Sequence, residues 1–405
     1  MKDRSPYSPL LHFLTQFLVF LTLILPASFP TTLRRLFFLP IAAIVYHIAF
    51  RSSSGDITTD VGIGPAVISQ GIIALDFVLL HDPRKHLRRK PAGGNLESEG
   101  TEGDRRLADD GGPGITIRQR VDWALALLVN PRGYGWSFEP APGVLPVRPS
   151  VEITRTRFLL GQLGKVLLCA TIEVAAYILN DANPIMHLKT GIWRSDINLA
   201  WKIIAILGIA AAGYARVNML YCLSAVATVA IGVSKPQAWP DLFGSIWEAW
   251  SVNAFWSRVW HQLIRRPLIS ITNTILPPTW GARGGVYDIF RLFALYFVSG
   301  VIHAAGEYMM LNAFSFESLL FFALQPIAII FEKTVLLRLF GNPKSPNNLE
   351  RILGFLYVLM WFTWTGPLFL DPMIRGGMFE DEKGTLGHTV VHSVLPRFGL
   401  DLRHQ

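Results

Sequence analysis

Long apolar segments, each close to the length needed to cross a bilayer, alternate with shorter polar stretches along most of the chain. A membrane-spanning helix needs about 20 mainly apolar residues to cross a hydrocarbon core of about 30 Å. The segments are continuous and do not alternate residue by residue, which favours helices over the strands of a membrane barrel. They lie near residues 10–27, 36–50, 63–80, 158–179, 197–233, 289–311, 319–337 and 352–370. The pattern predicts an all-α, polytopic transmembrane helical bundle with about eight or nine spans.

The segment 197–233 is too long for one untilted span, and Gly213, Arg216 and Asn218 interrupt it. It can form two short helices or one long helix with a polar patch. A charged side chain inside a membrane is costly and is often paired or functional. A loop position for Arg216 avoids that cost, so the loop is the preferred interpretation.

The polar stretch 81–157 separates the first three apolar segments from the others. Basic residues cluster at its start, and the positive-inside rule places them in the cytoplasm; they are Arg84, Lys85, Arg88, Arg89 and Lys90. Three spans before this cluster would leave the N-terminus in the lumen. We divide the chain into N-terminal transmembrane helices (1–80), a cytoplasmic loop with an amphipathic segment (81–157), a membrane core (158–370) and a polar C-terminal tail (371–405).

Within the loop, residues 121–129 are apolar but too short to span, and residues 130–136 read Asn-Pro-Arg-Gly-Tyr-Gly-Trp. One interpretation is an amphipathic helix at the membrane surface, followed by a glycine turn with an interfacial Trp136. The other is a loop helix packed on the protein. The sequence leaves both interpretations open.

Composition supports a membrane protein and narrows its partners. With 51% hydrophobic and 16% charged residues, the chain is far from the roughly 25% charged content of soluble domains. The net charge of +8 fits basic cytoplasmic loops, so we expect a lipid bilayer and no nucleic acid as partner. Cys169 and Cys222 lie in apolar segments without a Cys-x-x-Cys partner, which indicates buried packing residues and neither a disulfide framework nor a zinc site.

The stretch 243–267 is unusual, because it contains four tryptophans, one histidine and three arginines (Arg258, Arg265 and Arg266). On a helix, Trp256 and Trp260 lie one turn apart and share a face, with Asn253 three residues before Trp256 on the same side. His261 directly follows Trp260. Aromatic and basic side chains also suit the bilayer interface, so a simple interfacial anchor is the structural alternative.

A second histidine, His303, stands in the middle of the apolar segment 289–311, with Glu307 one turn further on. Ionisable residues at membrane depth usually face a cavity or a partner. His303 can be a packing residue that is hydrogen-bonded across the bundle, or a base that desolvation keeps neutral. The nucleophile elbow, the P-loop, the His-Glu-x-x-His zinc site and the His-x-x-x-x-Asp and His-His-x-x-x-Asp-Gly acyltransferase patterns are all absent.

Residues 254–262 read Ala-Phe-Trp-Ser-Arg-Val-Trp-His-Gln, and residues 299–303 read Ser-Gly-Val-Ile-His. In this combination the chain resembles the membrane-bound O-acyltransferase superfamily. It is most similar to the wax-synthase-like branch, whose motif reads roughly Phe-Trp-Gly-Arg-Arg-Trp-(Asn or His). Residues 130–136 also resemble a segment of fungal members that acylate alcohols of secondary metabolites. The chain departs at Ser257 and Val259, where the motif has Gly and Arg, and it carries His261 where many members have Asn.

The resemblance implies acyl transfer from an acyl-CoA to a hydroxyl in an intramembrane tunnel, with no metal and no bound cofactor. His303 would be the general base, and His261 would bind the thioester carbonyl or the tetrahedral oxyanion. Arginines of the motif stretch would contact the phosphates of CoA. The substrate-binding residues would be Asn253, Trp256, Arg258, Trp260, Arg265 and Arg266.

We therefore expect an acyl-CoA-dependent O-acyltransferase of the endoplasmic reticulum, which transfers acetyl from acetyl-CoA to a hydroxyl of a hydrophobic terpenoid or meroterpenoid. A wax synthase that uses a long-chain alcohol is the alternative within this class. A transporter or a noncatalytic membrane protein is the alternative outside it, although the paired repeats common in transporters are not visible. A membrane terpene cyclase would need acidic proton donors, and the apolar segments hold few.

Overall fold

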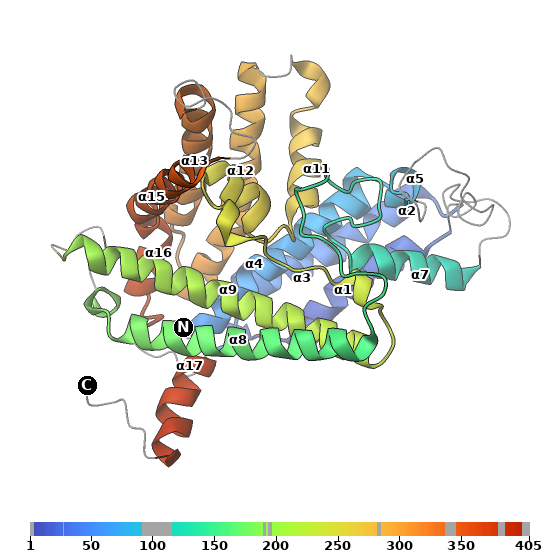
Figure 1. Ribbon diagram of the computed structural model, residues 1–405. Coiled ribbons are helices and arrows are strands. Elements are labelled where there is room, and N and C mark those ends of the chain that lie inside the picture. The colour runs from blue at the N-terminus through green and yellow to red at the C-terminus, as the bar shows by residue number, and fades with distance from the viewer. Residues whose placement is uncertain are drawn as a thin grey trace. The chain divides into compact units, whose positions relative to one another are not determined.

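In a computed structural model, the chain is a helical protein whose helices are joined by loops and short turns (Figure 1). The structure describes residues 4–26, 28–90, 116–188, 192, 197–281, 285–336, 346–379 and 385–398. Within these residues, strands are limited to the two-residue pair β1 (Ser5–Pro6) and β2 (Ser52–Ser53), which run in parallel. The predicted all-α fold class is confirmed.

The described residues form two compact units that interleave along the chain. The first unit contains Met1–Gly55, Asp60–Pro142 and Leu263–Asn312, and the second contains Asp56–Thr59, Gly143–Gln262 and Ala313–Gln405. The predicted boundaries at residues 80, 157 and 370 were drawn from hydropathy and topology, and they stay predictions.

The first unit is built on a shared apolar core. Val19, Ile48, Val67 and Leu127 are at most 2% exposed and come from four different helices. Ser8 starts the first of these helices, because its side chain accepts a hydrogen bond from the Leu11 N–H. The helices of this unit are α1 (Pro9–Ile24), α2 (Thr31–Leu36), α3 (Phe38–Arg51), α4 (Ile57–Ala74, from Asp60 on), the π-helix η1 (Leu75–Leu80), α5 (Pro83–His86), α7 (Ile117–Leu128), α11 (Arg265–Ile275), η6 (Pro278–Trp280) and α12 (Val286–Leu311).

The second unit is organised around the long antiparallel hairpin of α8 and α9, which lie side by side in Figure 1. Thr154 and Asn198 cap the starts of these two helices with their side-chain oxygens. The helices of this unit are α8 (Arg155–Asp181), η2 (Pro184–His187), α9 (Leu199–Ala230), η3 (Pro236–Ala238), η4 (Ile246–Glu248), α10 (Val252–Ala254), the π-helix η5 (Phe255–Val259), α13 (Glu317–Phe331), η7 (Glu332–Leu336), α15 (Asn348–Thr365), α16 (Pro367–Arg375), α17 (Leu386–Thr389), η8 (Val390–Val394) and η9 (Leu395–Phe398).

Six helices of the described chain are long and apolar enough to cross a membrane, or seven if the bent pair α15 and α16 counts as one span. This number is below the eight or nine that we expected. The first apolar segment forms α1, which has only 16 residues and is therefore about 24 Å long. The segment 197–233 forms one helix of 32 residues, α9, where two were possible.

The preferred loop position of Arg216 is therefore wrong. Arg216 lies within α9, and its Nε is 3.0 Å from the Glu173 carboxylate of α8. Glu173 is 2% exposed, so the guanidinium compensates a buried charge. Cys169 and Cys222 are buried free thiols in the same hairpin, as predicted.

Residues 116–138 pack into the apolar core of the first unit, which supports the second interpretation of this loop. Trp123 of α7 and Trp136 are 6% and 2% exposed, and their rings meet edge to face with centroids 5.8 Å apart. A tryptophan buried to this degree is not an interfacial anchor, so that interpretation of Trp136 is wrong. The acidic part of the loop lies outside the described residues.

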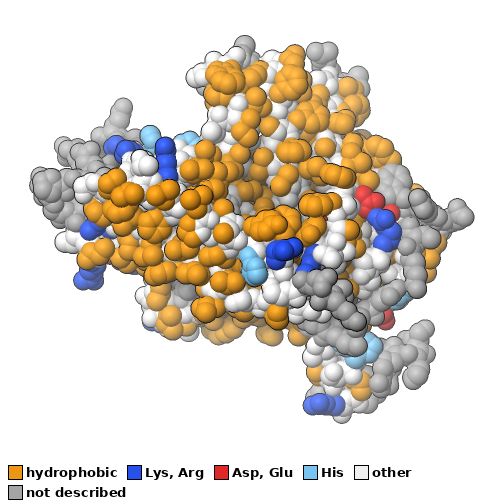
Figure 2. Space-filling model, turned by 180° about the vertical axis from the view of Figure 1, so that it is seen from behind, with side chains coloured by type: hydrophobic (Ala, Val, Ile, Leu, Met, Phe, Trp, Pro, Cys, Tyr) orange, Lys and Arg blue, Asp and Glu red, His pale blue; other side chains and the backbone are white. Residues whose placement is uncertain are grey.

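Two further features bear on membrane placement. Apolar side chains cover much of the face shown in Figure 2, and outward-facing leucines and phenylalanines on the long helices suit contact with lipid tails. The described part of the predicted polar tail is helical: α17 packs on α8, and the Tyr177 hydroxyl is 2.9 Å from His392 Nε2.

Candidate active site

The stretch 243–267 is not the continuous helix that the sequence suggested. It contains a 3₁₀ turn (η4), a single α turn (α10) and a π turn (η5), and it becomes extended at Trp260 (φ −70°, ψ 151°). The next helix, α11, begins only at Arg265. The predicted helical face shared by the two tryptophans is therefore wrong, although their rings still meet, with centroids 6.4 Å apart.

Two side chains, Glu332 from a distant helix and Gln262 from the stretch itself, supply hydrogen bonds that this irregular backbone lacks. The Val252 and Asn253 N–H groups donate to the Glu332 carboxylate at 2.5 and 3.0 Å. The Gln262 side-chain amide donates to the carbonyls of Trp256 and Trp260 at 2.7 and 2.9 Å. Buried backbone groups need such partners, so these bonds stabilise a non-helical path.

An aromatic cluster encloses the motif. Trp256 donates its Nε1–H to Gln325 Oε1 at 3.2 Å, and Trp361 donates to the same oxygen at 3.1 Å. Trp260 stacks on Phe255 at 5.5 Å between centroids. The tryptophans of the motif are thus packing residues with fixed ring positions, whereas Trp247 is 69% exposed.

His261 lies at the end of this cluster and is half-buried. Its ring is 5.9 Å from the Phe243 ring and 5.7 Å from the Trp260 ring, measured between centroids. Asn253 and Arg258 have exposed side chains. Arg258 forms an exposed ion pair with Glu248 at 3.7 Å.

His303 belongs to the first unit and lies in the regular helix α12. It is half-buried, and Glu307 is 1% exposed one turn further along. At Gly306, α12 approaches α4 so closely that an added Cβ would lie 2.7 Å from the Val61 carbonyl oxygen. An added Cβ at Gly64 would lie 2.5 Å from the Gly306 nitrogen. This backbone contact fixes the position of α12 next to His303.

Arg265 and Arg266 begin α11 and also belong to the first unit. The Arg266 guanidinium is 2.5 Å from the Asp76 carboxylate, which has no exposed surface. It also lies 4.3 Å above the Phe77 ring. Burial lowers the pKa of Arg265 and of Arg266, although Asp76 opposes the shift for Arg266; both stay protonated at neutral pH.

The predicted site residues therefore fall into two groups. The structure brings together Asn253, Trp256, Arg258, Trp260 and His261 in the second unit, while Arg265, Arg266 and His303 belong to the first. Within the described residues, no group of three or more His, Cys, Asp or Glu side chains is placed to hold a metal ion.

Sequence reasoning missed the residues that hold the motif in place. Gln325 is an isolated polar residue in an apolar stretch, and Glu332, which Lys333 follows, comes seven residues later and so on the same face of a helix. Asp76 is likewise a single acidic residue at the end of the third apolar segment. Such isolated polar residues were the available signal, but the sequence does not say which residues they bind.

Comparison with known proteins supports an O-acyltransferase. The profile described as membrane bound O-acyl transferase family matches residues 239–324, a range that includes both His261 and His303. Residues 239–324 are thus similar to membrane-bound O-acyltransferases, and the protein is an O-acyltransferase. The acyltransferase thus takes an acyl group from an acyl-CoA donor and gives it to an alcohol acceptor.

Similar proteins align with most of this acyltransferase. The acetyltransferase eriL of Hericium erinaceus is 26% identical over 86% of the chain and 87% of its own length. The acetyltransferase ple2 of Rhodocybe pseudopiperita is 27% identical over 92% of each chain. The O-mevalon transferase macI of Penicillium terrestre is 29% identical over 67% of each chain. No solved structure matches the acyltransferase.

Proposed function

We propose that the enzyme transfers the acetyl group of acetyl-CoA to a hydroxyl of a hydrophobic terpenoid or meroterpenoid in the endoplasmic reticulum membrane. The observation that carries this proposal is the alignment of two named acetyltransferases over nearly the whole chain. The membrane-spanning helices support a hydrophobic acceptor, because such a compound partitions into the bilayer from which the site is reached.

In the proposed reaction, His303 is the general base. Its neutral imidazole takes the proton of the acceptor hydroxyl while the hydroxyl oxygen attacks the thioester carbonyl carbon. The tetrahedral intermediate then expels the CoA sulfur, which receives the proton from the His303 imidazolium, and the products are an ester and free CoA. Glu307, buried one turn away on the same helix, is a positioning residue that orients the imidazole.

His261 stabilises the oxyanion of the same intermediate. A neutral imidazole N–H is a suitable donor, and loss of one oxyanion donor costs about 3 to 4 kcal/mol in comparable enzymes. The fixed rings around His261 support this role, because a preorganised donor need not reorganise during the reaction. Asn253, Trp256 and Trp260 would form the wall on the His261 side of the substrate tunnel.

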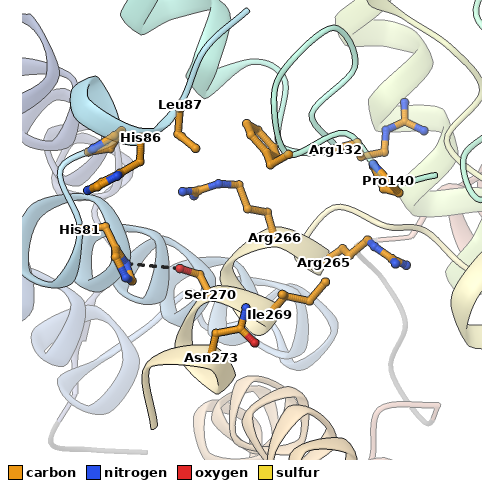
Figure 3. A pocket seen from close by; sticks show the side chains of 12 residues that line it. His81, His86, Leu87, Arg132, Pro140, Arg265, Arg266, Ile269, Ser270 and Asn273 are labelled. Atoms are coloured by element: carbon orange, nitrogen blue, oxygen red, sulfur yellow. Dashed lines mark hydrogen bonds between the residues drawn. The ribbon is translucent and has the colours of Figure 1, made fainter. Parts of the chain in front are cut away.

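The arginines of the motif stretch would bind the donor. Arg258 is exposed and paired only weakly with Glu248, so a CoA phosphate can compete for it. Arg265 and Arg266, which adjoin at the start of α11 and line the pocket drawn in Figure 3, would contact further phosphate oxygens; buried Asp76 holds Arg266 in place.

The direct test is an acyl-transfer assay in microsomes. Labelled acetyl-CoA and palmitoyl-CoA would each be offered with hydroxylated terpenoids and with fatty alcohols. We expect acetyl esters of terpenoids as the main product. Preferred transfer of palmitate to a fatty alcohol would replace the proposal by a wax synthase, and no ester from any pair would contradict the acetyl-transfer proposal.

A further inference from the structure

The middle of α9 carries polar side chains to which the proposed reaction gives no role. Tyr214 and Asn218 lie one turn apart near the centre of this 32-residue helix, and Asn218 is 8% exposed. A buried amide in an apolar helix is costly unless it is hydrogen-bonded, and polar residues at membrane depth often serve a function. The contacts of Asn218 show what it holds.

Asn218 holds the hydroxyl of Tyr214. The Asn218 Nδ2 amide donates to the Tyr214 oxygen at 3.3 Å and to Cys169 Sγ of α8 at 3.4 Å. On the other atom of the same amide, Cys222 Sγ lies 4.0 Å from Asn218 Oδ1. Because the amide has contacts at both ends, its plane is fixed, and so is the position of the tyrosine hydroxyl.

The Tyr214 ring packs on the Phe243 ring, with centroids 4.7 Å apart. Phe243 in turn meets the rings of Trp260 at 5.2 Å and His261 at 5.9 Å, at interplanar angles of 77° and 82°. Aromatic rings at these distances favour such edge-to-face geometry. One continuous series of contacts therefore joins Asn218 in the α8–α9 hairpin to the imidazole of His261.

The backbone is fixed on both sides of Phe243. Before it, the Tyr221 hydroxyl of α9 donates to the Pro240 carbonyl at 2.7 Å. After it, the Gly244 N–H donates to the Val259 carbonyl at 2.9 Å. An added Cβ at Gly244 would lie 2.2 Å from a backbone oxygen of the motif, so only glycine allows this close approach. The Phe243 side chain is therefore held at a fixed distance from the motif.

The imidazole of His261 needs such support from side chains. The backbone becomes extended at Trp260 and the next helix begins only at Arg265, so no helix fixes the orientation of the imidazole. An oxyanion donor acts best when it is already aimed at the developing charge, and a displacement of about 1 Å can cost about 100-fold in rate. The Phe243 ring is suited to prevent such a displacement.

We propose that Phe243 and Tyr214 are positioning residues for acyl transfer, which hold the His261 imidazole in the orientation that stabilises the oxyanion. Asn218 anchors this arrangement inside the α8–α9 hairpin. The inference rests on the proposed function, because it assumes the role of His261 in the reaction. A purely structural role for the same rings is the alternative, and it would lower stability without lowering the turnover of the folded enzyme.

Steady-state kinetics in microsomes test the positioning role. Phe243→Leu keeps an apolar side chain but removes the ring, so kcat should fall by about three- to tenfold, the scale of one aromatic pair, with little change in the KM for the alcohol. Tyr214→Leu should act in the same direction. Tyr214→Phe keeps the ring and loses only the hydrogen bond from Asn218, so it should retain more activity than Tyr214→Leu.

Phe355→Leu is the matched control. Phe355 is a half-buried phenylalanine of the same unit, and its ring meets Trp247 at 6.3 Å between centroids. Its kcat should equal that of the unmodified enzyme. Equal kcat values for Phe243→Leu and Phe355→Leu would overturn the positioning role.

A double-mutant cycle separates positioning from packing. If Phe243 acts through His261, Phe243→Leu should lower kcat in the unmodified enzyme but have no further effect in the His261→Ala variant. A double variant slower by the full product of the two single effects would overturn the inference, because Phe243 would then act independently of His261.

Chemical modification gives a readout that does not depend on turnover. Diethyl pyrocarbonate carbethoxylates neutral imidazoles, and mass spectrometry of the full-length protein would give the modification rate of His261 relative to His303 in the same sample. Phe243→Leu should raise this ratio, because the His261 ring becomes more mobile and more accessible. An unchanged ratio in a variant that keeps its thermal midpoint would overturn the inference, and so would a raised ratio with an unchanged kcat.

The inference and the proposed function fail in different ways. Normal turnover by His261→Ala would remove the oxyanion role proposed for His261, and the positioning role with it. Slow turnover by His261→Ala together with normal turnover by Phe243→Leu would overturn the positioning role alone and leave the proposed function standing.

Discussion

The two histidines proposed for catalysis are held in place by different means. His303 lies on a regular helix whose position depends on a backbone-to-backbone contact at Gly64 and Gly306. His261 lies on an irregular segment that depends on side chains from distant helices, chiefly Glu332 and Gln325. Substitutions near His303 should therefore act through packing, whereas substitutions near His261 should act through lost hydrogen bonds.

The largest expected effect is at His303. Because a general base contributes about 10² to 10⁴ in rate, His303→Ala should reduce acyl transfer by that factor while the protein still accumulates in the membrane. Initial rates in microsomes, normalised to the amount of protein, would measure this. Near-normal turnover by a variant that is inserted normally would remove the base assignment.

His261→Ala should have the next largest effect. Loss of an oxyanion donor lowers kcat by about tenfold or more, and the KM for the alcohol should change little. His261→Asn is the informative companion variant, because the amide also donates a hydrogen bond and should retain more activity than alanine. If His261→Ala and the unmodified enzyme have equal kcat values, the stretch 243–267 is an interfacial anchor and not part of the active site.

Glu332→Ala tests the side-chain support of the His261 segment. The Val252 and Asn253 N–H groups would lose their acceptor, at a cost of about 1 to 3 kcal/mol for an unsatisfied buried donor. The thermal midpoint and the activity should both fall, and Glu332→Gln, which keeps one acceptor oxygen, should fall less. An unchanged thermal midpoint in Glu332→Ala would show that the Glu332 carboxylate does not stabilise the His261 segment.

Gly306→Ala tests the backbone support of His303 and should lower the thermal midpoint, with the smallest effect on activity of the four variants. The new Cβ would meet the Val61 carbonyl oxygen at 2.7 Å, and overpacking of this kind costs about 1 to 3 kcal/mol when the helices can shift. Gly213→Ala is the matched control, because nothing lies within 4 Å of a Cβ at Gly213. Equal thermal midpoints for the two variants would contradict the tight contact.

This comparison also explains which features the sequence could predict. His303 was singled out because ionisable residues in the middle of a long apolar segment are rare, and the helix around it follows from hydropathy alone. The backbone conformation of residues 243–267 was not predictable. Glu332 accepts hydrogen bonds from N–H groups of this stretch, but it lies about 80 residues away in the sequence. The sequence pattern predicted a helix for this stretch, whereas hydrogen bonds from distant side chains stabilise an irregular backbone there.

Arg216 illustrates the same limit. A charge inside an apolar segment suggested a loop, yet α9 continues through it because Glu173 on the neighbouring helix compensates the charge. The pocket that Arg265 and Arg266 line in the first unit also combines segments more than 100 residues apart. Local patterns thus predicted the fold class and an O-acyltransferase, whereas the pairing of polar residues required the structure. The catalytic roles of the two histidines stay predictions.

The central claim is that His303 and His261 serve one reaction, and a double-mutant cycle tests it most directly. Sensitive radiolabel assays would give initial rates of acetyl transfer for the unmodified enzyme, His303→Ala, His261→Ala and the double variant. Residues that act as a unit have strongly non-additive effects. We predict a double variant about as slow as His303→Ala alone. A double variant slower by the full product of the two single effects would contradict the claim.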